Sequence, residues 1–257
     1  MSYEINLYPP QSFSEIGKKE TNEDYIIPSE NSAVGDRNAF FCCDGVGGSP
    51  FGEIASKIAC ESMEAFFKTN PNIIHNESVM NFAVRYAREK LNDYENNHPE
   101  TRGMKTTITA LRFHHEGATL AWMGDSRIYQ VRDGKILYQT WDHSYVNTLV
   151  DQGLLSKDDR RTHPKRNSIT RTLGTAKSDR IPETKKITDI NADDFFLLCT
   201  DGLLEQVRDK HIESWFSKSE KPENIKAVLL NHCRNITQDN FSMILIKIKR
   251  VIVRDSS

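Results

Sequence analysis

The apolar and polar positions of this chain follow two different periods, which together predict a fold of both strands and helices. Short runs that are apolar or alternating, and that turn residues bound, are typical of β-strands. Such runs cover residues 40–43, 108–113, 118–122, 128–132, 195–200 and 243–248. Asp133 and Gly134 join the run at 128–132 to a further strand at 135–138 as a two-residue hairpin turn.

Helical spacing marks longer segments between these strands. Apolar residues recur with the period of a helix through 54–67 and again through 79–91, and we expect these stripes to face the core. Strands grouped with helices that do not alternate with them indicate an α+β layered fold. The chain has 257 residues and no Pro/Gly/Ser-rich linker, so we expect a single domain spanning 1–257.

Aspartates stand where apolar strand patterns end, namely Asp44, Asp201 and Asp239. An Asp-Gly pair taken alone is more often a plain turn, because Asp bonds its own backbone and Gly accepts positive φ. Repetition changes this balance, since buried carboxylates at strand ends are costly when unpaired and are normally held by cations. An oxygen-only ligand set selects Mg²⁺ or Mn²⁺ over zinc. Further acidic residues stand in similar settings, namely Glu23, Asp24 and Asp125.

Eight segments in a fixed order carry a resemblance to a known family. They are 17–24 (GKKETNED), 43–48 (CDGVGG), 105–110 (KTTITA), 124–129 (GDSRIY), 142–146 (DHSYV), 169–174 (ITRTLG), 199–203 (CTDGL) and 239–240 (DN). In them the sequence resembles the metal-dependent protein serine/threonine phosphatases, the PPM or protein phosphatase 2C family, in its bacterial form. One such motif is weak, whereas eight in sequence make coincidence improbable.

The resemblance implies a layered sandwich of two antiparallel β-sheets flanked by α-helices, with a metal cleft at one end. It implies two Mn²⁺ or Mg²⁺ ions as cofactors. Asp44 would bridge both ions and the Gly45 carbonyl would bind one of them. Asp201 and Asp239 would bind the other ion.

The same resemblance assigns supporting roles to other acidic residues. Glu23 and Asp24 would hold metal-bound waters and so orient the site. Asp125 is the family's candidate ligand for a third, weaker ion. Glu205 stands where an Asp often helps to bind that third ion.

The chain departs from the family pattern at Lys19 and Val46. The family usually carries Arg at the position of Lys19, where it clamps the substrate phosphate; Lys supplies a point charge without the planar fork of Arg. A cation here is expected to contact phosphate and not metal, and the alternative is that Lys18 and Lys19 are a solvated pair. Val46 stands where animal members have a histidine proposed as general acid, and valine donates no proton. Bacterial relatives also lack that histidine, so water or another acid is expected.

The segment 144–174 corresponds to the mobile flap beside the cleft in relatives. It begins with an expected amphipathic helix at 145–152 and continues with many charged residues. Its basic residues would guide phosphoprotein substrates, although an ordinary solvated loop explains the composition equally well. His143 and His163 are expected to be capping or surface residues and not acids.

Composition sets limits on partners and compartment. The net charge of −2 gives no reason to expect nucleic acid or an anionic membrane as partner. The N-terminal residues lack the regions of a signal peptide and no apolar run reaches the length of a membrane span, so the cytoplasm is the expected compartment. The five cysteines lack zinc-type spacing and are expected in the core. A nucleophilic Cys beside Asp44 would need an activating base, and none is evident.

Two functions of different class follow. The first is hydrolysis of phosphoserine and phosphothreonine in proteins by a water activated between two metal ions, with phosphorylated proteins as partners, including a eukaryotic-like Ser/Thr kinase. The second is a catalytically weak module of the same fold that binds phosphorylated proteins. The complete set of carboxylates favours the enzyme, and Lys19 is the only clear feature that favours the module.

Overall fold

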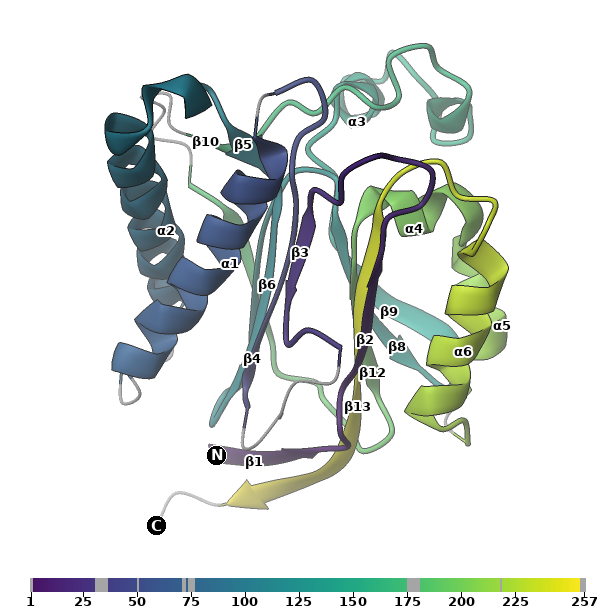
Figure 1. The fold of residues 1–257 in the computed structure, drawn as a ribbon. Coiled ribbons are helices and arrows are strands. Elements are labelled where there is room, and N and C mark those ends of the chain that lie inside the picture. The colour runs from purple at the N-terminus through teal and green to yellow at the C-terminus, as the bar shows by residue number, and fades with distance from the viewer. Residues whose placement is uncertain are drawn as a thin grey trace.

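Two antiparallel β-sheets are stacked between layers of helices (Figure 1). The structure is a computed structural model, and it describes residues 2–30, 37–49, 51–70, 73, 77–174, 181–217 and 219–254. The larger sheet runs in the order β1 (Ser2–Leu7), β13 (Phe241–Arg254), β12 (Phe195–Cys199), β8 (Arg127–Arg132) and β9 (Lys135–Gln139), and β13 also pairs with β2 (Gln11–Glu15). The second sheet runs in the order β11 (Glu183–Ile187), β7 (Gly117–Met123), β6 (Ile108–His114), β4 (Ala39–Asp44) and β3 (Asp24–Ile27).

Helices cover the outer face of each sheet. The second sheet is covered by α1 (Gly52–Thr69) and α2 (Glu77–Asn97), and the larger sheet by α4 (Asp201–Gln206), α5 (Asp209–Trp215) and α6 (Pro222–Cys233) (Figure 1). The remaining short elements are α3 (Tyr145–Asp151), the strand pair β5 (Lys105–Thr106) and β10 (Leu173–Gly174), and 3-10 turns at Pro99–Thr101 and Asp159–Arg161. Within the described ranges, every helix is too short or too polar to cross a membrane.

The apolar run in β4 shows why the sheets lie where they do. Phe40 and Cys42 belong to the apolar cluster between the two sheets, whereas Phe41 and Cys43 belong to the cluster under α1 and α2. Successive strand residues point to opposite faces, so a strand covered on both sides is apolar without interruption. A third cluster lies between the larger sheet and the helices α4 to α6. The predicted α+β sandwich is therefore confirmed.

The predicted elements are present with small changes of bounds. The expected helix at 145–152 is α3, and the hairpin turn at Asp133 and Gly134 has positive φ at both residues, 46° and 73°. The strand expected at 243–248 is much longer, because β13 has 14 residues and pairs with β12, β2 and β1. The strands β1, β2, β3 and β11 carry no clear local pattern. They are defined by the partners with which they pair.

Candidate active site

Acidic residues from separate segments meet at one end of the sandwich. Asp24 begins β3 and Asp44 ends β4, and the two residues are directly opposite in the antiparallel register. Asp201 begins α4 directly after β12, and Asp239 lies just before β13. Asp125 lies in the connection between β7 and β8. Figure 1 shows these strand ends at the edge of the sandwich that also carries α3 and α4.

The Asp44 carboxyl is central in this group, because it contacts the carboxyls of both Asp24 and Asp201. Thr200 Oγ1 donates a hydrogen bond of 2.8 Å to Asp24 Oδ2, so the residue before Asp201 also supports Asp24 across the two sheets. The negative charge of Asp125 also acts on Asp44. Predicted ligands from distant parts of the sequence are thus brought together.

Burial makes these carboxyls hard to ionise at the same time. Burial is the largest cause that raises the pKa of Asp24 to about 7 and the pKa of Asp201 to about 6. The pKa of Asp44 and the pKa of Asp125 also lie well above the usual aspartate range, first through burial and then through neighbouring carboxylates. A bound cation would reverse these shifts, because it stabilises the ionised forms.

The donor set fits Mn²⁺ or Mg²⁺. Asp24 Oδ1 and Asp125 Oδ1 are buried and accept no hydrogen bond from the described residues, which is costly for a carboxyl oxygen unless a cation binds it. All the surrounding ligand groups are oxygens, which these hard ions prefer. Among the described residues, however, no group of three or more His, Cys, Asp or Glu side chains is already arranged to hold a metal ion. The ion pair between Lys19 and Asp239 offsets part of the negative charge in this group.

That ion pair is made by Lys19. Its Nζ lies 3.0 Å from Asp239 Oδ1, and the two side chains are 48% and 42% exposed. The hydrogen bond that Lys19 donates to Asp239 is the largest cause that raises the pKa of Lys19. Lys19 therefore contacts a predicted metal ligand, a contact that the sequence did not indicate, and its contact with a substrate phosphate stays a prediction. Lys19 is about half exposed and ion-paired, whereas Lys18 is exposed.

Glu23 is held at the site mainly through its backbone. Its carbonyl oxygen accepts hydrogen bonds from Gly45 N at 3.0 Å and from Ser56 Oγ at 2.6 Å. Its amide donates to Asn240 Oδ1 at 2.9 Å. Burial is the largest cause that raises the pKa of Glu23. Gly52, the first residue of α1, lies against the Glu23 carboxylate, where an added Cβ would lie 2.9 Å from Oε2.

Asn240 is a site residue whose role the sequence analysis did not identify. Its Oδ1 accepts from the Glu23 amide, and its Nδ2 donates to the carbonyls of Ile16 and Thr21. One amide side chain therefore fastens the loop that carries Lys19 and Glu23 to the start of β13. The only sequence clue was its place directly after Asp239.

The residues predicted for a third ion are placed differently from each other. Asp125 is buried with the central carboxyls, and the charge of Asp201 acts on it. Glu205 is exposed on α4, and its Oε2 accepts a hydrogen bond of 2.8 Å from the Gln238 amide. Glu205 therefore supports the turn before Asp239 in this structure.

A buried ion pair underlies the segment that begins at 144. Arg127 Nε and Nη2 donate to the two carboxylate oxygens of Asp142, each over 2.7 Å. His143 is buried, and its Nδ1 accepts from the Gly124 amide while its Nε2 faces Glu183 Oε1 at 3.0 Å. His143 is thus a structural residue, which ties the base of this segment to the residue before Asp125.

Gly202 permits the close approach of α4 and β13, and this contact leads to a stability prediction. A Cβ at Gly202 would lie 1.9 Å from the Asn240 carbonyl oxygen. We expect Gly202→Ala to lower the free energy of unfolding by about 1–3 kcal/mol, the usual cost of overpacking. Urea unfolding checks this. Gly47→Ala is the control, because no atom lies within 4 Å of a Cβ there; equal stability of the two variants would contradict the prediction.

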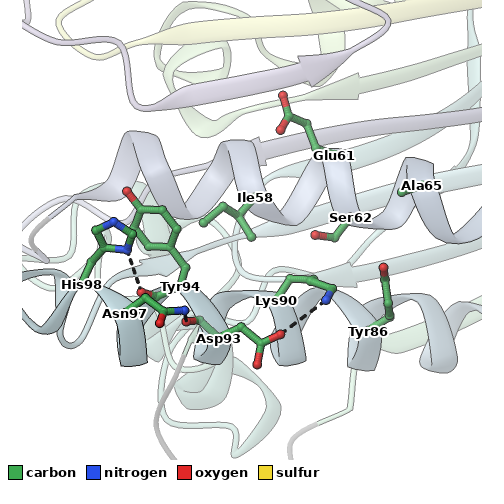
Figure 2. A pocket seen from close by; sticks show the side chains of 10 residues that line it. All are labelled: Ile58, Glu61, Ser62, Ala65, Tyr86, Lys90, Asp93, Tyr94, Asn97 and His98. Atoms are coloured by element: carbon green, nitrogen blue, oxygen red, sulfur yellow. Dashed lines mark hydrogen bonds and ion pairs between the residues drawn. The ribbon is translucent and has the colours of Figure 1, made fainter.

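A groove lies elsewhere, on the outer face of the helical layer. Figure 2 shows it between α1 and α2, and its volume is about 480 Å³. Two aromatic side chains, Tyr94 and His98, are stacked at 4.1 Å along one wall. Its carboxylates are already engaged, because Glu61 accepts from Tyr25 OH and Asp93 pairs with Lys90. None of its lining residues belongs to the group of acidic residues at the strand ends.

Comparisons with known proteins point to one family. The family model described as Protein phosphatase 2C matches residues 14–227. Serine/threonine protein phosphatase PstP from Mycobacterium tuberculosis is 28% identical over 84% of this chain. That match covers 41% of the PstP sequence, so the chain spans less than half the length of this relative. Protein phosphatase PhpP from Streptococcus pneumoniae is 31% identical over 77% of this chain and 80% of its own length.

A solved structure gives the same result at the level of the fold. The catalytic domain of the serine/threonine protein phosphatase PstP, in complex with two manganese ions, superposes with a TM-score of 0.74 at 25% identity. The superposition covers 95% of this chain and 99% of that domain.

Proposed function

This chain belongs to the protein phosphatase 2C family, and from that premise we propose that it hydrolyses phosphoserine and phosphothreonine in proteins with two bound Mn²⁺ or Mg²⁺ ions. The observation that carries the proposal is the contact of the Asp44 carboxyl with those of Asp24 and Asp201. The unpartnered buried oxygens of Asp24 and Asp125 support it, because they lie in the same group and suit a hard cation.

In this proposal Asp44 would hold both ions, the Gly45 carbonyl would hold one, and Asp201 with Asp239 would hold the other. The Gly45 backbone packs closely against Gly52. A Cβ at Gly45 would lie 2.4 Å from the Gly52 carbonyl carbon, so only glycine fits. Thr107 Oγ1 accepts from the Asp44 amide at 3.0 Å and fixes the direction of that residue.

The remaining acidic residues have supporting roles in the proposal. Glu23 and Asp24 would orient ion-bound waters, since Glu23 is fixed through its backbone and Asp24 by Thr200. Asp125 is proposed as a ligand of a third ion, and Glu205 on α4, which accepts from the Gln238 amide, is proposed to help bind it.

Catalysis then divides between the ions and the chain. When bound, two adjacent ions supply an activated water and stabilise the charge on the phosphoryl oxygens. Lys19 is proposed to bind the substrate phosphate as a charge-assisted donor. Asp44 is placed by the end of β4 and Asp201 by the start of α4, while the Asn240 amide donates to Asp239 Oδ1 at 2.9 Å, and these supports preorganise the site.

Metal-dependent hydrolysis tests the proposal directly. The purified protein is expected to hydrolyse p-nitrophenyl phosphate and a phosphothreonine peptide with Mn²⁺, to lose this activity in excess EDTA, and to regain it when Mn²⁺ is restored. Full activity after chelation would contradict the metal mechanism.

A second candidate function is favoured by one observation, the pairing of Lys19 with Asp239. If this pair persisted, Asp239 would not serve a metal ion and the fold would act as a catalytically weak module that binds phosphorylated proteins. Binding of a phosphopeptide without Mn²⁺-dependent turnover would support the module.

Lys19 variants are expected to change catalytic efficiency. With saturating Mn²⁺, Lys19→Ala should lower kcat/KM by about ten- to a hundredfold, since a charge-assisted hydrogen bond contributes about 1–3 kcal/mol. Lys19→Arg should preserve or improve kcat/KM, because Arg binds phosphate through two donors. Steady-state kinetics on a phosphopeptide measures both; an unchanged value for Lys19→Ala would leave phosphate recognition to other groups.

Thiol alkylation is expected to leave activity unchanged. The cysteines Cys42, Cys43, Cys60, Cys199 and Cys233 are all fully buried. Burial also raises the pKa of Cys199 to about 12 and the pKa of Cys233 to about 11, so little thiolate is present near neutral pH. Iodoacetamide treatment followed by mass spectrometry and an activity assay checks this. Inactivation of a folded protein would revive a cysteine mechanism.

We also propose that the segment 144–174 is a flap beside the site. Hydrogen bonds pin both of its ends, from the Tyr145 amide to the Ser168 carbonyl and from the Thr170 amide to the His143 carbonyl. Its far end returns as β10, which pairs with β5, and the Lys105 carbonyl of β5 accepts from the Val46 amide.

Phosphorylated proteins, a protein kinase among them, are the proposed substrates, and the cytoplasm is the proposed compartment.

A further inference from the structure

We infer that Lys19 is a built-in competitor of the metal ion at Asp239, and that it turns to the substrate phosphate when the ion binds. This inference rests on the proposed function, which assigns Asp239 to a metal ion. It starts from the ion pair between Lys19 Nζ and Asp239 Oδ1 at 3.0 Å. An ammonium group and a divalent cation repel each other at contact distance. Each therefore lowers the affinity of Asp239 for the other.

Backbone packing holds the two residues together. Gly17 has a φ of 62°, and a Cβ there would lie 2.0 Å from the Asp239 carbonyl oxygen. The next residue, Lys18, donates its amide hydrogen to the Gln238 carbonyl at 3.2 Å. The backbone just before Lys19 is thus fastened to the backbone beside Asp239.

The chain after Lys19 is fastened to the same segment. Asn240 Nδ2 donates to the Ile16 carbonyl at 2.8 Å and to the Thr21 carbonyl at 3.0 Å. Lys19 lies between these two carbonyls in the sequence. The Lys19 backbone is therefore held beside Asp239 by a closed loop, and from there the side chain reaches the carboxylate.

The two adjacent lysines differ in their interactions with the acidic residues. Glu23 and Asp201 attract Lys19 in addition to Asp239. Lys18 is exposed and makes no ion pair with any described residue. The two adjacent lysines therefore have different surroundings, and only Lys19 acts on the acidic group.

The consequence is a coupling between metal and substrate. The Lys19 side chain has a flexible four-carbon stem, so its ammonium group leaves Asp239 without movement of the fastened backbone. A phosphate at the site offers it a new anionic partner, which frees Asp239 for the ion. Because coupling is reciprocal, the bound ion raises the affinity for phosphate by the same factor.

Metal binding by matched lysine variants tests the inference. Binding of Mn²⁺ is measured by the electron paramagnetic resonance signal of the free ion, which needs no activity. Lys19→Met is expected to bind one Mn²⁺ about two- to fivefold more tightly than the unsubstituted protein, a factor set by the modest strength of partly exposed ion pairs. Lys18→Met, which removes the same charge one residue away, is expected to change Mn²⁺ affinity much less. Thermal unfolding verifies that both variants fold.

A double-mutant cycle separates direct competition from a general effect of charge. In the Asp239→Asn background, Lys19→Met is expected to leave Mn²⁺ affinity unchanged, because the carboxylate for which the two cations compete is gone. Equal Mn²⁺ affinity of Lys19→Met and the unsubstituted protein would overturn the inference, as would equal gains in Lys19→Met and Lys18→Met. If the unsubstituted protein bound no Mn²⁺ at all, the proposed function itself would fail, and this inference with it.

Discussion

Asp44→Asn is expected to abolish Mn²⁺-dependent hydrolysis, with a loss of about a thousandfold or more in kcat/KM, because the central carboxylate of a hydrolytic site is removed without a change in shape. The Asp44 carboxyl contacts those of both Asp24 and Asp201. Steady-state kinetics at saturating Mn²⁺ measures the loss. Near-normal turnover would contradict the assignment.

The same variant is expected to be more stable than the unsubstituted protein in EDTA. An amide at position 44 relieves the repulsion among buried carboxyls, which is what raises the pKa of Asp44 after burial itself. Each kcal/mol gained raises Tm by about 2–4 °C for a domain of this size. Asp158→Asn, on the exposed surface of the segment 144–174, is the control for the loss of one negative charge. Loss of activity combined with loss of stability would mean that Asp44 supports the fold, and it would count against a role of Asp44 in metal binding.

The metal-free protein is expected to become less stable as the pH rises from about 4 to about 7. The pKa of Asp24 is raised to about 7 and that of Asp201 to about 6, from 3.8 in the unfolded chain. Between these limits the folded protein binds more protons than the unfolded chain, so stability decreases with rising pH. Below about pH 4 these two carboxyls are protonated in both states, so their contribution to stability is fully present. One pKa unit corresponds to about 1.4 kcal/mol, so the loss amounts to several kcal/mol.

Urea unfolding in EDTA across this pH range measures the trend. Saturating Mn²⁺ should reverse the slope, because the ion binds the ionised carboxylates of the folded state. Asp44→Asn should flatten the slope in EDTA, since it removes one of the interacting carboxyls. A metal-free protein whose stability rises steadily through this range would show that these carboxyls are ionised and well compensated in the fold.

Much of the fold was accessible from the chain alone. The run Phe40 to Cys43 is apolar at every position, which is what a strand covered on both faces requires, and it forms β4, an interior strand of the second sheet. The turn at Asp133 and Gly134 was equally clear, because its positive φ values need these residue types. By contrast, β2 has only Phe13 as a large apolar residue, and it becomes a strand through its pairing with β13.

The sequence by itself determined which residue types stand at the strand ends, and hence that oxygen ligands are gathered in this protein. Only the tertiary structure decided which of them touch: Asp44 on Asp24 and Asp201, Lys19 on Asp239, and Glu205 on the Gln238 amide. The reason is physical, since strand and turn patterns depend on neighbours in the chain, whereas these contacts depend on how two sheets stack. The clamp between Asn240 and Glu23 joins residues 217 positions apart, and no local period specifies such a contact.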